Sequence, residues 1–269
     1  MRKIRYTIER DPTTNWILGP VAGCVDFLAV EMAMAGVMVR GLELLPLVPP
    51  LMKVAAGEVG RKLGPKAVAP LKAFLAQDMA LEGMAETLAD HDYALPNAHT
   101  LVSLWGGIEA CIEDTVVLTL LNDPPSVLVI GREIKLRATS SGLLEEPEAR
   151  SAFRSLERKA RQTKNVMEAY DWCLSLLNIR RLPGSDLSAI FKEINALRNA
   201  IMHNTGIADD RAVQAAPTLK LKRGDQIRLS RSQIQEYYGA ISKFVQELLQ
   251  GIIKSRHLRP KEELKAKKV

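Results

Sequence analysis

Cysteine and aromatic residues are scarce in this chain. Among its 269 residues are only three cysteines, Cys24, Cys111 and Cys173, and aromatic residues make up 5%. The cysteines lie far apart and form no Cys-x-x-Cys pair, so the sequence predicts neither a disulfide framework nor a zinc site. With 47% apolar residues, the chain can bury a full core without cross-links, and we expect a reducing, cytoplasmic setting.

Sequence signatures of metal, nucleotide and serine-hydrolase sites are also missing. The four histidines are His91, His99, His203 and His257. No two of them have a zinc-binding spacing, and the chain has no Gly-x-Ser-x-Gly elbow or phosphate-binding glycine loop. His91 stands between Asp90 and Asp92, which could hold a metal weakly, but a solvated loop is the better interpretation. We therefore expect no metal and no cofactor.

A secretory signal is not expected at the N-terminus, which lacks an uninterrupted apolar region followed by a small-residue cleavage site. The segment Trp16 to Val39 is long enough to cross a bilayer, but Pro20, Asp26 and Glu31 interrupt it. One central carboxylate costs roughly 2.5–3.5 kcal/mol in a membrane helix. We interpret the segment as a buried helix of a soluble protein and expect no membrane contact, with an anchor over residues 16–53 as the alternative.

The net charge of +6 is concentrated near the C-terminal end. From Lys254 to Val269 there are seven basic and two acidic residues, a net charge of +5. Such a segment attracts polyanions without reading their sequence, and it is equally typical of a solvated, disordered end. We expect residues 254–269 to form a basic, disordered tail.

Prolines divide the apolar stretches of residues 13–95, which predicts short helices there rather than one long helix. They are Pro46, Pro49, Pro50, Pro65 and Pro70. The polar segment from Asp90 to Asn97 ends in Pro-Asn and predicts a domain boundary. We therefore expect a helical region of unknown role over residues 1–95 and a second domain over residues 97–253.

Apolar residues recur every three to four positions over most of this second domain, which is the period of a helix face. The predicted helices cover Thr100 to Leu121, Glu145 to Lys164, Asn165 to Leu177, Ser185 or Asp186 to about Asn204, and Ser232 to Ile253. Gly206 can end the fourth of these in a left-handed conformation. Residues Val127 to Leu136 fit either a short hairpin or an irregular crossover, and the sequence leaves both open.

The segment between the last two helices has the pattern of a β-hairpin. Apolar and polar residues alternate from Leu219 to Leu229 on both sides of Gly224-Asp225, a turn sequence. An odd-numbered loop would pair Leu221 with Ile227 on one face of the hairpin. We therefore predict a mainly all-α fold, a helical bundle with a small β-hairpin insertion.

The helix that ends near Asn204 carries a charge within its apolar stripe. On a helical projection, Arg198 falls among the apolar positions. A guanidinium does not lose its proton in proteins and is very costly to bury alone, so Arg198 needs a carboxylate or an anionic ligand. On the Thr100 to Leu121 helix, Glu109 flanks the apolar face and is the expected partner, whereas Asp114 lies on the opposite side.

Asn199 and His203 lie one turn apart and are expected to face outward on the same side of their helix. His203 is in the last turn, where the carbonyl end of a helix favours an imidazolium by up to about 2 kcal/mol. It can therefore donate or accept a proton near neutral pH. A simpler interpretation is equally open, in which Asn199 and Asn204 help to end the helix and His203 is a surface histidine.

The hexapeptide Arg198-Asn199-Ala200-Ile201-Met202-His203 resembles the R-N-x-x-x-H form of the R-x(4–6)-H motif of the HEPN superfamily. These are helical ribonucleases of toxin–antitoxin, abortive-infection and CRISPR systems. The segment Trp105-Gly106-Gly107-Ile108-Glu109 is similar to a first HEPN helix with an acidic residue, and the resemblance covers residues 97–253. HEPN toxins paired with nucleotidyltransferase antitoxins have a tyrosine two positions after the histidine, where this chain has Thr205.

The resemblance implies a metal-independent endoribonuclease with a toxin or phage-defence role. In such enzymes the ribose 2′-hydroxyl attacks the adjacent phosphodiester and leaves a 2′,3′-cyclic phosphate. His203 would be the general base or acid and Arg198 would hold the phosphate. Asn199 would orient the histidine or bind the RNA backbone, with Glu109 and Asn204 in support. The expected partners are RNA, a second copy of the chain in a homodimer, and an antitoxin or regulatory protein. The alternative is an inactive HEPN domain that binds RNA or protein.

Overall fold

The computed structural model describes residues 16–69, 83, 85–89, 91–135, 143–181 and 187–258. These residues form α-helices and short 3₁₀ helices joined by turns, and no β-strand occurs among them. The predicted all-α class is therefore confirmed. The helices that build the bundle are α1 (Gly19–Leu44), α4 (Ala94–Asn122), α5 (Pro124–Ile134), α6 (Glu146–Arg161), α7 (Val166–Leu176), α8 (Ser188–His203), α9 (Asp210–Ala215) and α10 (Arg231–Ile253).

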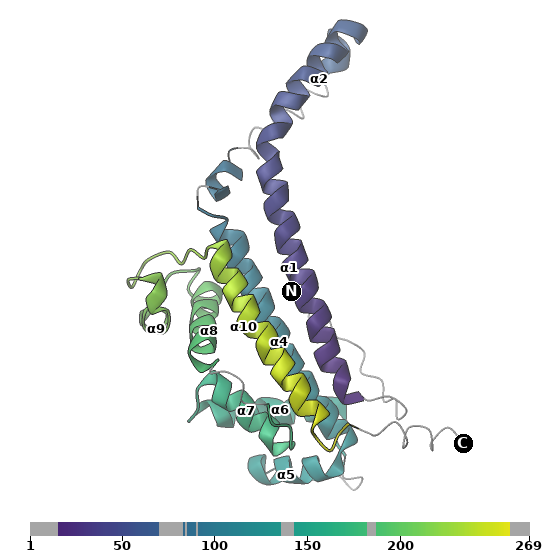
Figure 1. Cartoon of the computed structure of the whole chain (residues 1–269), viewed down its shortest axis with the longest axis vertical. Helices are drawn as coiled ribbons and strands as arrows, with labels where there is room; N and C mark the ends of the chain where they lie inside the picture. The colour runs from purple at the N-terminus through teal and green to yellow at the C-terminus, as the bar shows by residue number, and fades with distance from the viewer. Residues whose placement is uncertain are drawn as a thin grey trace, which may run out of the picture.

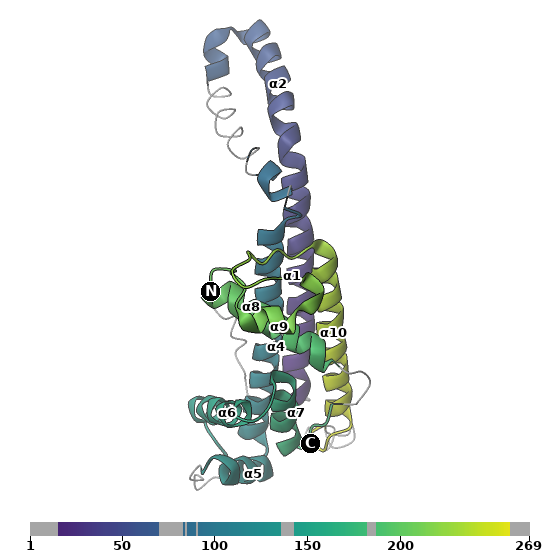
Figure 2. The same cartoon turned by 90° about the vertical axis from the view of Figure 1, so that its left-hand side faces the viewer.

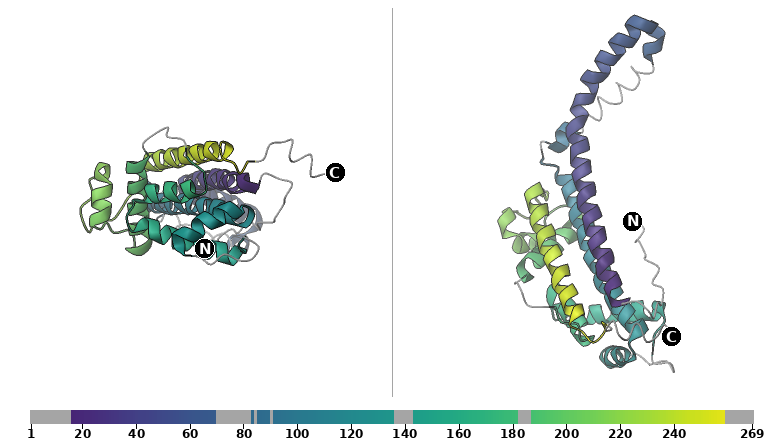
Figure 3. Two further views of the ribbon diagram at one scale, coloured as in Figure 1. Left: turned by 90° about the horizontal axis from the view of Figure 1, so that it is seen from below. Right: turned by 45° about the vertical axis from the view of Figure 1, so that its right-hand side comes forward.

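The long helix α4 lies at the centre of the bundle and is covered on several sides. It packs against α1, α10, α6 and α8, and α7 and α5 also contact it. Figure 3 shows α1, α4 and α10 running side by side along the length of the bundle. The short helices α5, α6 and α7 gather at one end of α4, and α8 leads from them toward α9 (Figure 1).

The few aromatic side chains are concentrated in the core around α4. The ring of Trp105 lies 5.6 Å from that of Phe191 and 6.4 Å from that of Tyr170, and Phe191 lies 5.1 Å from Phe244. All four rings are almost completely buried. Tilted aromatic pairs of this kind contribute about 0.5–1.5 kcal/mol each beyond the burial of their area. These contacts join α4, α7, α8 and α10 into one core.

Local capping signals explain where several predicted helices begin. Asn165 accepts a hydrogen bond from the backbone N–H of Glu168 and Glu168 bonds back, which forms a capping box at the start of α7. α10 begins with a similar box at Ser230. After the C-terminal end of α8, Gly206 has a left-handed φ of 80°, and its N–H donates to the carbonyl oxygen of Ala200. The predicted stop at Gly206 is confirmed.

Helix α4 begins at Ala94, six residues before the predicted Thr100. Pro96 belongs to the predicted boundary segment, but a proline fits the first turn of a helix, where its missing N–H needs no partner. The side chain of Asn97 donates to the carbonyl oxygens of Asp92 and Leu229, which fixes this end of α4 to the segment before α10. The proposed cap of α8 at Ser185 or Asp186 lies outside the described residues.

The N-terminal region differs from the prediction of short helices. α1 runs unbroken for 26 residues, because Pro46 comes only after its end. The 3₁₀ helix η2 (Leu45–Leu47), α2 (Val48–Leu63) and η3 (Pro65–Val68) follow. The outer part of α1 and all of α2 extend beyond the rest of the bundle (Figures 1 and 2).

The prediction of a buried helix over Trp16 to Val39 is wrong for most of its surface. Val21, Cys24, Leu28 and Val39 are buried. The exposed large apolar side chains of α1 are Val25, Val30, Met34, Val37, Met38 and Leu44. The helical stretch Trp16–Leu44 is long and apolar enough to cross a membrane by length and composition, and only 17% of its most apolar window is buried. Such a helix is weak evidence of a membrane span, because core helices and signal sequences have the same composition.

Two segments that could have been hairpins have other structures. Residues 127–134 belong to helix α5, which begins after Asp123, so neither the hairpin nor the irregular crossover considered for them is correct. The predicted hairpin from Leu219 to Leu229 is also wrong. Leu219 ends the 3₁₀ helix η4 (Pro217–Leu219), and Gln226 forms an isolated antiparallel bridge with Ile207.

The partner of residues 224–227 is a segment that lies earlier in the chain. The N–H of Ala208 donates to the carbonyl oxygen of Asp225 at 2.8 Å, and the N–H of Ile227 donates to that of Gly206 at 2.8 Å. Ile227 and Leu229 are buried as the alternating pattern requires. The alternation therefore predicted which side chains face the core. It did not predict which segment the backbone of these residues would pair with.

Candidate functional site

The predicted pairing of Arg198 with Glu109 is present in the structure. Nη2 of Arg198 on α8 donates to Oε2 of Glu109 on α4 at 3.1 Å. Nη1 of Arg198 donates to Oδ1 of Asn199 at 2.9 Å. Nε of Arg198 is buried and has no hydrogen-bond partner in the described part of the chain. The guanidinium is therefore fixed by two acceptors and keeps one buried N–H unsatisfied, which is a costly arrangement without a further ligand.

Asn199 has a contact that the sequence analysis did not predict. Its side-chain oxygen accepts from Arg198, so Asn199 helps to fix the guanidinium. His203 is the last residue of α8 and is exposed, as predicted. No residue of the described ranges donates to or accepts from its ring. Along the helix axis the rise from Arg198 to His203 is about 7.5 Å, and the two side chains leave the helix about 140° apart around that axis.

Asn204 supports the turn that follows His203. Its side-chain nitrogen donates to Oδ2 of Asp209 at 3.3 Å, and Asp209 caps α9 by accepting from the N–H of Ala212. Thr205 has a left-handed φ of 53° ahead of Gly206, so the chain turns sharply away from the helix axis. The turn leaves the imidazole of His203 uncovered.

Three residues that the sequence analysis missed surround Glu109. Nη2 of Arg161 lies 2.7 Å from Oε1 of Glu157 and 3.8 Å from Oε1 of Glu109. It also donates to the hydroxyl oxygen of Tyr170 at 3.1 Å, and its guanidinium lies over the Tyr170 ring. The i,i+4 spacing of Glu157 and Arg161 was the available signal, but it predicts only a surface pair.

The charges of this network show in the pKa values of its members. Burial raises the pKa of Tyr170 well above its ordinary value, and the nearby Glu109 raises it further. Burial alone would lower the pKa of Arg161, but Tyr170 and Glu157 raise it above that of an ordinary arginine. Tyr170 is therefore a neutral hydrogen-bond acceptor for Arg161 at neutral pH and not a base.

An open hollow adjoins Glu109 on the side of α6. Its volume is about 560 Å³. The hollow is lined by Glu109, Arg154, Glu157, Arg158, Arg161 and Gln162. Because Glu109 also binds Arg198, the hollow and the C-terminal part of α8 share one carboxylate. The cationic side chains that line the hollow come from α6, and Arg198 of α8 is linked to them through Glu109.

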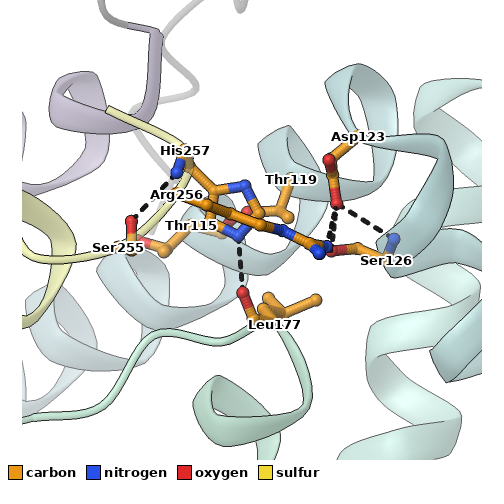
Figure 4. Close-up of polar contacts among 8 residues, drawn as sticks. All are labelled: Thr115, Thr119, Asp123, Ser126, Leu177, Ser255, Arg256 and His257. Carbon is orange, nitrogen blue, oxygen red and sulfur yellow. Dashed lines mark hydrogen bonds and ion pairs between the residues drawn. The ribbon is translucent and has the colours of Figure 1, made fainter. Parts of the chain in front are cut away.

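A second polar cluster lies where the chain leaves α10 (Figure 4). His257 is buried, its Nε2 contacts the carbonyl oxygen of Leu177, and its ring lies 6.0 Å from that of Trp16. Arg256 donates to Oδ2 of Asp123 at 2.7 Å, which also accepts from Ser126. Residues 254–258 of the predicted tail therefore pack against the bundle, whereas residues 259–269 lie outside the described part.

This second cluster lacks the geometry of a hydrolase site. Oγ of Ser126 bonds to Asp123 and not to His257, so no base is in place to activate the hydroxyl. In the described ranges, no group of three or more His, Cys, Asp or Glu residues could hold a metal ion. Asp90, beside His91, lies outside those ranges.

Comparisons with protein-family models, with curated proteins and with solved structures find no match to this chain. The chemistry of the site is therefore inferred from its own residues.

Proposed function

We propose that the protein is a metal-independent endoribonuclease of the HEPN type. The observation that carries the proposal is the placement of Arg198, which is held between Glu109 and Asn199 about 1.4 turns before an uncovered His203. A fixed guanidinium and a free imidazole are the two groups that phosphodiester cleavage by an internal hydroxyl needs.

The roles of the residues follow from this chemistry. An imidazole removes the proton of a ribose 2′-hydroxyl, whose oxygen attacks the adjacent phosphorus while the bond to the 5′-oxygen breaks. The 5′-oxygen leaves with a proton, and the products are a 2′,3′-cyclic phosphate and a 5′-hydroxyl. Arg198 binds the phosphate oxygens and stabilises the charge that develops on them. Asn199 and Glu109 position Arg198, and Asn204 supports the turn beside His203.

One proton must be removed and another supplied, and each chain has one such motif. We therefore propose a homodimer in which the two His203 side chains share a cleft on a twofold axis. The exposure of His203 supports this arrangement, because a second copy can approach it. The substrate is RNA in the cytoplasm, and an antitoxin or regulatory protein controls the activity in a toxin or defence role.

A second function is favoured by one specific observation. The charge of Arg198 is already balanced by Glu109, as it would be in a domain that keeps the HEPN fold without cleaving. In that case the protein is a module that binds RNA or another protein.

Incubation of the purified full chain with mixed RNA in EDTA separates the two functions. We expect fragments that end in 2′,3′-cyclic phosphates, and we expect the His203→Ala variant to retain RNA binding without cleavage. Wild-type protein that binds RNA and leaves it intact would favour the binding module instead.

A further inference from the structure

A row of arginines follows one side of α6. Arg150, Arg154, Arg158 and Arg161 are three or four residues apart, so they lie on the same side of the helix. Arg150 is occupied by Glu113, Asp114 and Glu146, and Arg161 is occupied by Glu157.

The two middle arginines of the row are free to bind a ligand. Arg154 and Arg158 are exposed, and the described part of the chain offers neither of them an ion-pair or hydrogen-bond partner. Both line the hollow beside Glu109. An arginine that pairs with nothing in the chain presents its whole planar fork of donors to solvent, and this fork matches the geometry of a phosphate.

The hollow has a net positive charge although two carboxylates line it. Glu109 is held by Arg198 and lies near Arg161, and Glu157 is held by Arg161. The lining arginines Arg154, Arg158 and Arg161 against these two glutamates leave a net charge of +1, and Arg198, which binds Glu109 from α8, raises the charge of the whole cluster to +2. The excess is contributed by the two exposed arginines that have no partner.

We propose that Arg154 and Arg158 bind the phosphodiester backbone of RNA beside the cleavage site at Arg198 and His203. The choice of RNA as the ligand rests on the proposed function. The two side chains originate about 6 Å apart along α6, so each can bind a separate phosphate of one strand. Arg161 and Glu109 join this row to Arg198, which makes the binding surface continuous from α6 to α8.

The carboxylates in the hollow favour a strand over a lipid surface. A flat anionic membrane would have to bring its head groups close to Glu109 and Glu157. A flexible strand can contact individual guanidinium groups and avoid both glutamates. Backbone contacts of this kind add affinity without sequence preference.

The test measures binding of the full chain to a fluorescent 2′-O-methyl oligoribonucleotide, which has no free 2′-hydroxyl and cannot be cleaved. Fluorescence anisotropy gives Kd over a range of salt concentrations. We expect Arg154→Ala/Arg158→Ala to bind about tenfold more weakly at low salt. Its log–log salt slope should fall by roughly 1.4, which is about 0.7 for each lost phosphate contact on a single strand.

The matched control is Lys53→Ala/Lys62→Ala, which removes the same charge from α2. This helix extends away from α6 (Figure 1), so the control should bind like the wild type. Circular dichroism checks that both variants are folded, and the full chain keeps its basic tail in every sample.

Three outcomes would overturn the inference. If the α6 variant binds RNA like the control while the wild type cleaves RNA, the proposed function is supported. The inference that Arg154 and Arg158 bind the RNA backbone is then wrong. If the wild type binds no RNA, the row has no RNA ligand. If the α6 variant loses binding to phosphatidylserine vesicles but not to RNA, the ligand is a lipid surface. If Arg154→Ala/Arg158→Ala weakens RNA binding but the wild type never cleaves RNA, the two arginines bind RNA and the catalytic proposal is refuted.

Discussion

The guanidinium of Arg198 lies 3.1 Å from the carboxylate of Glu109, although 89 residues separate them in the chain. The contact joins α8 to α4, and both side chains are only partly exposed, at 23% and 32%. Partial burial reduces the solvent screening that makes exposed ion pairs weak. This pair therefore couples the stability of the bundle to the geometry of the proposed site.

Glu109→Gln should lower both the stability and the activity of the protein. The neutral amide leaves Arg198 partly buried without a counter-charge, and we expect a loss of about 1 kcal/mol in the free energy of unfolding. Urea denaturation measures the loss, and RNA cleavage should fall because the guanidinium is no longer fixed. Glu58→Gln is the control, since Glu58 forms an exposed i,i+3 pair with Arg61. Equal effects of the two substitutions would contradict this prediction.

His203→Ala should abolish RNA cleavage and leave stability unchanged. General acid–base catalysis contributes about 10²–10⁴-fold to rates of this kind. The side chain is exposed at the end of α8, so its removal uncovers no core surface. His99→Ala removes another exposed histidine, on α4, and should retain full activity. A matching loss of activity in both variants would show that His203 has no special role.

The contribution of Asp123 to stability should depend on pH. Burial alone would raise the pKa of its carboxyl, but hydrogen bonds from Ser126 and the charge of Arg256 lower it below the ordinary value of 3.8. The ionised form therefore stabilises the folded state above pH 3.8, and this stabilisation is lost as the pH falls below that value. Asp123→Asn keeps a side chain that can cap α5 and removes only the charge.

We expect Asp123→Asn to cost about 0.5–1 kcal/mol at neutral pH and progressively less toward pH 3. Asp114 supplies a control of opposite sign, because burial raises the pKa of its carboxyl. For that group the ionised form is disfavoured in the folded state, so stability relative to Asp114→Asn should fall as the pH rises above 3.8. Denaturation at a series of pH values measures how the stability difference between each variant and the wild type changes with pH. If the two differences change in the same direction, the opposite pKa directions given for Asp123 and Asp114 are wrong.

Features encoded by neighbouring residues could be predicted from the sequence. The capping residues Asn165 and Ser230 and the left-handed Gly206 act within one turn of their helices, so the ends of α7, α8 and α10 are local properties. The partner of Arg198 was also predictable, because a helical projection shows which face of α4 carries a carboxylate.

Features that depend on packing between distant segments could not be predicted. The backbone of Gln226 pairs with Ile207 rather than across its own turn, and only the tertiary fold brings those two together. Arg161 and Tyr170 join the network because α6 and α7 meet beside α4. The exposure of α1 could not be predicted for a similar reason, because the apolar composition of a helix does not show whether another helix covers it.

The two faces of α1 should respond differently to the same substitution. Leu28 is 3% exposed against the bundle, whereas Val37 is 67% exposed. We expect Leu28→Ser to cost about 3 kcal/mol or more in the free energy of unfolding and Val37→Ser less than about 0.5 kcal/mol. Chemical denaturation of the two variants measures this contrast. A large cost for Val37→Ser would mean that another molecule covers this face in solution.

Gly251 and Gly239, both on α10, should respond oppositely to alanine. A Cβ atom at Gly251 would lie 2.5 Å from the carbonyl oxygen of Arg180, whereas nothing lies within 4 Å of one at Gly239. The backbone beside Gly251 is held in place because Arg181 bonds to Glu247 on the same helix and to Asp171 on α7. It cannot move aside without weakening a largely buried ion pair. Gly251→Ala should therefore cost about 1–3 kcal/mol in the free energy of unfolding, as overpacking of a core does.

Gly239→Ala should instead stabilise the protein by about 0.5–1 kcal/mol, because alanine in an exposed helical position restricts the unfolded chain more than glycine does. Both variants add one methyl group to the same helix, so intrinsic helix propensity cancels when they are compared. The difference in urea midpoint between them then measures the contact of α10 with the Arg180 backbone. Equal midpoints would mean that α10 does not approach this backbone closely in solution.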